Sequence, residues 1–226
     1  PISKPTTVTV TIKGGTSGIT DADGVQLDSN GDGKLDGSDG DKVFSFTVVS
    51  TITKTLSLAS GWNLISSPLS PSNTTTTSIF NTIASDIAIV WEFTNPSTWK
   101  SYIPTDYDEN DLSAIHNIDV NKGYWVKTKK AVDLALTGGL ISSKKISLAS
   151  GWNLVGFKQV TDVSSTTALQ GISNDVSIIW EFTNPSTWKS YIPTDYDEND
   201  LSAIHKFVVG KGYWIKTKKA VDWTLP

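Results

Sequence analysis

Apolar and polar residues alternate in short runs along the chain, and turn residues separate the runs. Thr7-Val8-Thr9-Val10-Thr11-Ile12 is the clearest case, and residues 43–49 repeat the pattern. Alternation with a period of two is typical of half-buried β-strands. The same criterion predicts six further strands, at residues 54–58, 62–66, 87–93, 99–103, 123–128 and 132–136.

Helical periodicity is limited to short stretches. Ile79, Phe80 and Ile83 have helical spacing after a run of threonines that can cap a helix, which predicts one short helix within 77–85. Residues 111–116 predict a further helical turn. Asn95-Pro96-Ser97 predicts a hairpin turn. Many short strands with one small helix indicate an all-β fold, either a β-sandwich or a small barrel.

The chain contains two copies of one unit, which explains why the strand pattern recurs. The 26 residues of Trp91–His116 return unchanged as Trp180–His205, and Ser57–Leu64 returns as Ser147–Leu154. We therefore predict three modules: an N-terminal β module at 1–53 and two homologous β units at 54–143 and 144–226, each with one short helix.

The N-terminal module contains a pattern of oxygen ligands typical of a calcium loop. Calcium takes about six to eight oxygens from alternate side chains and a backbone carbonyl. Gly33 supplies the sharp bend, and the closing position has Asp in place of the usual Glu. Seven Asp between residues 21 and 41, with only Lys34 among them, would repel one another without a cation. The predicted ligands are Asp28, Asn30, Asp32, Lys34 through its carbonyl, Asp36 and Asp39. A solvated turn without metal is the alternative.

These twelve residues resemble the calcium-binding loops of dockerin modules and of thrombospondin-type repeats. The flanking residues have the strand pattern and do not resemble an EF-hand. The resemblance implies a calcium ion that holds a loop between strands and has a structural role.

Each repeat also contains an acidic cluster and one histidine. The clusters at 106–111 and 195–200 suggest weak calcium binding or paired carboxylates for glycoside hydrolysis, but a capped helical turn is a simpler interpretation. His116 and His205 have no Ser or Asp at a triad spacing, so we interpret them as structural.

Four tryptophans occupy matching positions in the two repeats. Exposed tryptophans stack on sugar rings in carbohydrate-binding modules, whereas a small β unit without disulfides needs large side chains in its core. Both interpretations stay open for this set. The residues predicted to be exposed and to contact a ligand are Trp99, Tyr102 and Tyr107, with Trp188, Tyr191 and Tyr196 in the second copy.

Composition excludes several classes of function. The chain has no Cys and no Met, and its 19 basic residues are all Lys. Absent thiols exclude zinc–thiolate sites and disulfides, and absent Arg with a net charge of −4 argues against nucleic-acid binding. No apolar run is long enough to span a membrane. The initial Pro indicates a processed or trimmed chain, and the composition predicts a secreted bacterial protein.

The combination of Gly-Trp-Asn-Leu, Trp-Glu-Phe and Lys-Gly-Tyr-Trp segments in both units resembles a β-rich repeat of secreted and cell-surface bacterial proteins. That resemblance implies an adhesive or scaffold role and provides no catalytic residues.

From these observations we expect a non-enzymatic structural protein of the cell surface, a filament or surface-layer subunit stabilised by calcium. It would form homo-oligomers by adding the strand at residues 5–13 to a neighbouring sheet. The alternative is a carbohydrate-binding or adhesion module that uses the repeated aromatics. A glycosidase using Asp106, Asp108 or Glu109 is the third hypothesis.

Overall fold

A computed structural model describes residues 6–12, 42–48 and 51–226, which belong to two compact units, Pro1–Ser50 and Thr51–Pro226. In the first unit, strands β1 (Thr6–Ile12) and β2 (Lys42–Val48) pair antiparallel from Thr6 opposite Val48 to Ile12 opposite Lys42. Both strands were predicted from the alternation. The calcium loop at 28–39 lies outside the described residues.

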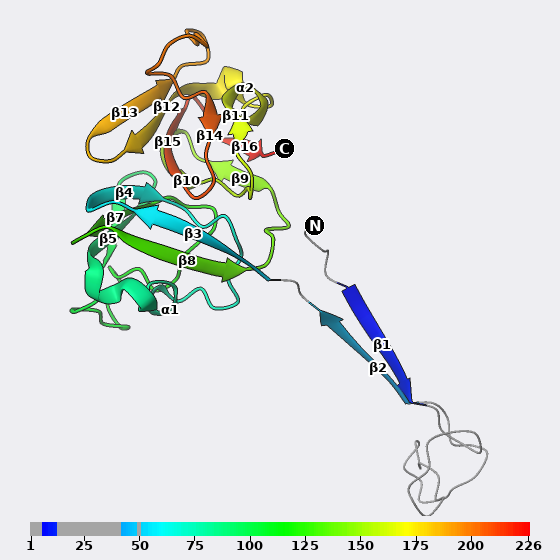
Figure 1. The fold of residues 1–226 in the computed structure, drawn as a ribbon. Helices are drawn as coiled ribbons and strands as arrows, with labels where there is room; N and C mark the ends of the chain where they lie inside the picture. The colour runs from blue at the N-terminus through cyan, green and yellow to red at the C-terminus, as the bar shows by residue number, and fades with distance from the viewer. Residues whose placement is uncertain (1–5, 13–41, 49–50) are drawn as a thin grey trace, which may run out of the picture. The chain divides into compact units, whose positions relative to one another are not determined.

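The second unit contains both repeats, which lie side by side (Figure 1). In the first repeat, one sheet has the strand order β4-β7-β5-β6, and β3 pairs with β8. The elements are β3 (Ile52–Leu58), β4 (Gly61–Ile65), helix α1 (Thr76–Ile79), 3-10 helix η2 (Asn81–Asp86), β5 (Ile87–Thr94), β6 (Thr98–Tyr102), β7 (Tyr124–Thr128) and β8 (Val132–Gly138).

The second repeat has the same architecture. Its four-stranded sheet has the order β10-β15-β12-β13, while β16 pairs with β9 and β11 with β14. The elements are β9 (Lys145–Leu148), β10 (Gly151–Gly156), β11 (Val163–Ser164), α2 (Ser165–Ala168), η3 (Ser173–Asp175), β12 (Val176–Thr183), β13 (Thr187–Tyr191), β14 (Lys206–Phe207), β15 (Gly212–Thr217) and β16 (Val221–Thr224). The predicted all-β fold is confirmed.

Each repeat has its own hydrophobic core between its sheets. In the first repeat, Leu134 of β8 and Val90 and Val126 of the four-stranded sheet are fully buried in one cluster with Phe80. In the second repeat, Trp223 occupies the position of Leu134 and donates its indole N–H to the carbonyl of Ala168 at 2.7 Å. One face of each four-stranded sheet is therefore buried in the core of its own repeat.

Two helical predictions need correction. The predicted helix at 77–85 consists of one α-helical turn followed by a 3-10 helix, and Thr75 makes no side-chain capping bond. β-Branched threonines are poor helix formers, which accounts for the short turn. Residues 111–116 form turns without a helix: the Asp111 carboxylate accepts the backbone N–H of Ser113 at 2.8 Å, and Ala114 forms a bridge with Ser101.

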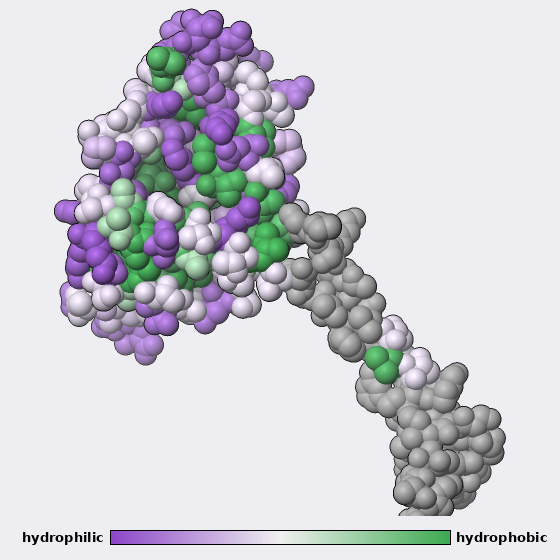
Figure 2. Space-filling view, viewed as in Figure 1, coloured by the Kyte–Doolittle hydropathy of each residue, from purple (hydrophilic) through white to green (hydrophobic). Residues whose placement is uncertain are grey.

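The surface of the second unit is mostly hydrophilic in the view of Figure 2, with hydrophobic residues gathered in patches. Within the part of the chain that the structure describes, no helix is long and apolar enough to cross a membrane.

Candidate functional site: an aromatic groove between the repeats

Alternation along the strands places the tryptophans on one face of each four-stranded sheet. In the first repeat, Trp125 of β7 lies between Leu64 of β4 and Trp91 of β5 in the strand register. Trp99 of β6 lies opposite Phe93 of β5. Directly opposed residues point to the same face, so these side chains share the face that the core of the repeat leaves free.

The aromatic faces of the two repeats pack against each other. Leu64, Phe93, Leu154 and Phe182 form a buried cluster of their own, and Trp62, Trp125, Trp152 and Trp214 pack around it. The contacts are reciprocal. Phe93 lies 4.9 Å from Trp214 of the other repeat, and Phe182 lies 4.9 Å from Trp125, measured between ring centroids. Reciprocal contacts between equivalent surfaces are the pattern of a two-fold interface.

Two asparagines stabilise this interface by equivalent hydrogen bonds, one from each repeat to the other. The Asn95 side-chain amide donates to the carbonyls of Ser150 and Trp152 at 3.2 and 2.8 Å. The Asn184 amide donates to the carbonyls of Ser60 and Trp62 at 3.0 and 2.8 Å. Each asparagine lies in the turn of one repeat's hairpin and satisfies backbone acceptors on the edge strand of the other repeat. The turn therefore fixes the position of the aromatic side chains on its own hairpin.

The backbones of the repeats also meet directly. The Ser66 N–H donates to the carbonyl of Gly210 at 2.8 Å, and the Gly156 N–H donates to the carbonyl of Asn121 at 2.9 Å. A methyl group on Gly156 would lie 2.8 Å from the carbonyl oxygens of Val120 and Lys122, which is closer than side-chain carbons approach. These bonds leave little freedom for the two sheets to slide.

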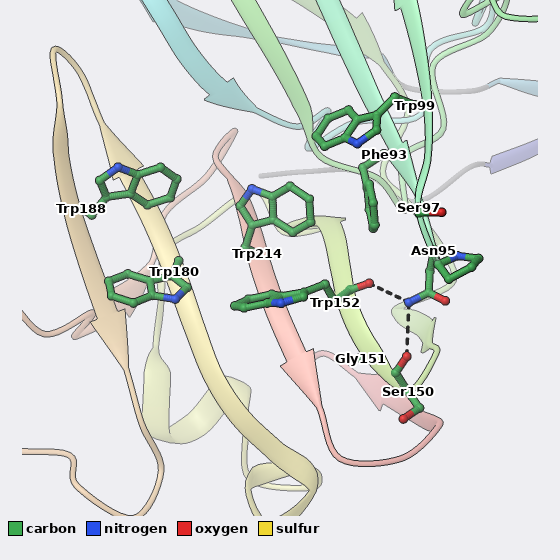
Figure 3. Close-up of a pocket in the computed structure, with 11 residues that line it drawn as sticks. Phe93, Asn95, Ser97, Trp99, Ser150, Gly151, Trp152, Trp180, Trp188 and Trp214 are labelled. Carbon is green, nitrogen blue, oxygen red and sulfur yellow. Dashed lines mark hydrogen bonds between the residues drawn. The ribbon is translucent and has the colours of Figure 1, made fainter.

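The hairpins and the facing sheets enclose two apolar pockets with volumes of about 900 and 700 Å³. Figure 3 shows Trp180 and Trp188 on one side of the larger pocket, Phe93 and Trp99 on the other side, and Trp152 and Trp214 between them. The smaller pocket has the equivalent lining from the opposite repeats: Trp62, Trp91, Trp99, Trp125, Phe182, Pro185, Ser186 and Trp188. Trp99 and Trp188 line both pockets, so we treat the pockets as one surface, the aromatic groove.

Packing leaves part of the tryptophan surface in the groove exposed. Trp99 and Trp188 are 44% and 43% exposed, and each packs edge-on against the tryptophan before it in the hairpin, Trp91 or Trp180. Within the described residues, no groove tryptophan donates its indole N–H to a protein acceptor, in contrast to Trp223. The groove therefore presents both ring surface and hydrogen-bond donors to a ligand.

Of the six predicted ligand-contact residues, only Trp99 and Trp188 line the groove. The expected exposure was wrong for Tyr102 and Tyr191, which are 4% and 5% exposed in the two cores. They follow the alternation to the face opposite the tryptophans. Burial raises the pKa of both phenols.

Tyr107 and Tyr196 also lie away from the groove. Each is half-buried and packs against its own core, and its hydroxyl lies 3.0 or 3.1 Å from Nδ1 of His116 or His205. The tyrosine hydroxyl thus provides each histidine with a structural partner.

Buried carboxylates lie on the core side of the sheets. Glu92 is 6% exposed and accepts from Nζ of Lys122 at 2.5 Å, and Glu181 pairs with Lys211 in the same way. Burial, followed by the charge of Glu92, raises the pKa of Tyr124 far above its ordinary value. Neither pocket of the groove is lined by Asp or Glu.

The acidic loops form local turns. Asp108 accepts the backbone N–H of Asn110 at 2.8 Å, and Asp111 accepts the hydroxyl of Ser113. A hydrogen-bonded Ser113 lowers the pKa of Asp111. Across residues 6–12, 42–48 and 51–226, no group of three or more acidic or His side chains is arranged to hold a metal ion.

Phe93 and Phe182 were not predicted as site residues, and Asn95 was predicted only as part of a hairpin turn, without its contact to the other repeat or that of its counterpart Asn184. Two features of the sequence point to these residues. Phe93 is two residues after Trp91 on the same predicted strand, so both side chains share one face, and the whole hairpin is repeated unchanged. Neither feature reveals that the aromatic face of one repeat covers that of the other.

Comparisons of the chain with protein-family models, curated proteins and solved structures found no match. The class of the protein is therefore defined by its own architecture, an all-β chain with a duplicated unit and an aromatic groove at the junction.

Proposed function

We propose that the body formed by the two repeats is a non-enzymatic carbohydrate-binding module of a secreted or cell-surface protein, with the aromatic groove as its binding site. The observation that carries this proposal is the pair of half-exposed indoles, Trp99 and Trp188, which line both pockets. A pyranose has an apolar face of C–H groups that stacks on an indole, and its hydroxyls remain hydrated in an open groove. Indole N–H groups without a protein acceptor can bond to ring and hydroxyl oxygens.

The groove also meets the energetic requirements of a binding site. Its walls are held by strands and by the bonds of Asn95 and Asn184, so little order has to be gained on binding. Aromatic side chains bury large areas and have few rotatable bonds, which makes them frequent centres of binding energy.

The test is binding to an immobilised glycan panel, followed by calorimetry of the best ligand. Trp99→Ala and Trp188→Ala should each weaken binding by about 2 kcal/mol, or about 30-fold, the loss expected for a central aromatic contact. Leu112→Ala and Leu201→Ala provide the matched control, because this pair is apolar, 87% exposed and lines neither pocket. Unchanged binding by the double tryptophan variant, with the fold intact by circular dichroism, would exclude the groove as the site.

A second function, as a subunit of an extracellular filament or surface layer, is favoured by the β1–β2 hairpin. Within the described residues these strands pair only with each other. A two-stranded sheet is marginal in water, and an open edge can accept another strand. Because β2 already covers one edge of β1, a neighbouring subunit would use the other edge. Deletion of residues 1–13 should abolish filaments seen by negative-stain microscopy, and filaments that persist would count against strand addition.

A further inference from the structure

This inference rests on the proposed function and concerns the charge of the ligand. The groove has an unequal set of polar groups: indole N–H donors are abundant, and carboxylates are absent from the lining of both pockets. Asn95, whose amide could act in recognition, already donates to two backbone carbonyls. A ligand in this groove therefore needs oxygen acceptors more than it needs donors.

Two lysines add positive charge on the same face. Lys127 lies opposite Trp62 in the strand register, with Nζ 5.5 Å from the Trp62 ring centroid. Lys216 lies opposite Trp152 at 5.6 Å in the other repeat. Trp62 and Trp152 each line one pocket, so one lysine stands beside each pocket.

Neither of these two lysines has a carboxylate partner within the described residues, so the cation–π contact leaves their charge uncompensated. In the part of the chain that the structure describes, six lysines form ion pairs, and neither Lys127 nor Lys216 is among them: Lys122, Lys130, Lys145, Lys206, Lys211 and Lys219. The chain has an overall charge of −4, so two cations without a carboxylate partner, beside a groove without acidic side chains, are a local exception to its net charge. Cations in such positions attract anionic ligands.

We propose that the groove binds an acidic polysaccharide, a chain of pyranoses that bear carboxylates, with one carboxylate facing Lys127 and another facing Lys216. The sugar faces stack along Trp99 and Trp188, which line both pockets. The carboxylates of the ligand accept hydrogen bonds from the indole N–H donors of the lining. Charge complementarity selects this ligand over a neutral glycan. A proline-rich peptide also has rings with apolar C–H faces and carbonyl acceptors, but it offers no negative charge to the lysines.

The experiment uses the intact chain and two probes, a hexamer of galacturonic acid and its methyl ester, which lacks the charges and carries one extra methyl group per residue. Calorimetry at low salt should show about tenfold tighter binding of the acid, and the difference should shrink as ionic strength rises. The Lys127→Gln/Lys216→Gln double variant should bind acid and ester alike. Lys130→Gln/Lys219→Gln removes two lysines that are paired with Asp86 and Asp175, and it should retain the preference.

The outcomes separate this inference from the proposed function. Equal binding of acid and ester, abolished in the Trp99→Ala/Trp188→Ala variant, would overturn the acidic ligand and leave the carbohydrate site standing. Equal or tighter binding of a sulfated hexasaccharide would overturn the assignment to carboxylates. Tighter binding of a polyproline decamer than of either hexamer would overturn both proposals.

Discussion

Gly156 is the position where the packing of one repeat against the other can be tested most directly. It lies at the end of β10 and corresponds to Ser66 in the first repeat. A Cβ atom added to it would lie 2.8 Å from two backbone oxygens, those of Val120 and Lys122, and 3.1 Å from Cβ of Ser66. Both oxygens belong to backbone that is held by the bond from the Gly156 N–H to Asn121, so they cannot move aside independently.

The magnitude follows from these contacts. Overpacking a rigid interior site costs roughly 1–3 kcal/mol, and three short contacts with backbone and a buried side chain place Gly156→Ala near about 2 kcal/mol. For a unit of this size, each kcal/mol lowers the melting temperature by about 2–4 °C, so we expect a decrease of about 4–8 °C.

The assay is urea unfolding followed by tryptophan fluorescence. All nine tryptophans lie between residues 62 and 223, so the signal reports only on the unit formed by the repeats. Gly171→Ala is the matched control, since nothing lies within 4 Å of an added Cβ at that position. The control should be neutral or slightly stabilising because alanine restricts the unfolded chain. If Gly156→Ala matched Gly171→Ala within about 0.5 kcal/mol, the close approach of the repeats would be refuted.

Three further predictions address the asparagines, the buried tyrosines and the calcium loop. Asn95→Ala and Asn184→Ala should each cost about 1–2 kcal/mol in urea unfolding, because two backbone acceptors lose their donor, whereas Asn110→Ala, in an exposed local turn, should cost less than about 0.5 kcal/mol. Burial raises the pKa of Tyr124 and Tyr213, so their contribution to stability is complete below the ordinary value of 10.0 and is lost as pH rises above it. Tyrosinate absorbance from these two residues should therefore appear only with unfolding, and a separate titration in the folded state would contradict this. If Asp28–Asp39 bind calcium, a chelator should lower a calorimetric transition of the N-terminal unit, and Asp28→Asn/Asp32→Asn should abolish the effect; an unchanged scan would argue against calcium.

The strands of the repeats could be predicted from the sequence because one face of each strand is buried in the core, which produces the apolar alternation. A residue such as Val90 points to the core and its neighbour Trp91 points away, so the period of two is visible without knowledge of the fold. The helix at 77–85 was less predictable, because its threonines and the turn after Phe80 divide it between two helical forms. Local propensity is a weak guide for segments this short.

The groove could be predicted only in part. The sequence identified Trp99 and Trp188, but the prediction for Tyr102 was wrong. Tyr102 directly follows Ser101, which shares the groove face with Trp99, so the alternation puts Tyr102 on the core face. Contacts between repeats are long-range, and each repeat alone has a chemically reasonable exposed aromatic face. Only the structure shows that Phe93 lies under Trp214 of the other repeat while Trp99 remains half-exposed.

The geometry of the junction accounts for one identity and one difference between the two copies. In a two-fold interface, a residue away from the axis contacts a non-equivalent residue of the other repeat, so one side chain can make the same contact from both repeats. Asn95 and Asn184 make such equivalent bonds, to the carbonyls of Trp152 and Trp62. Residues near the axis face their own equivalents, and Ser66 faces Gly156 with too little room for two side chains. Ser66 uses the space by donating its hydroxyl to the carbonyl of Lys211 at 2.7 Å and accepting the N–H of Phe157 at 3.0 Å. A single repeat paired with a second copy of itself would place the same residue on both sides of that axis. The present pair combines a hydrogen-bonding serine with a glycine, which two identical repeats could not do.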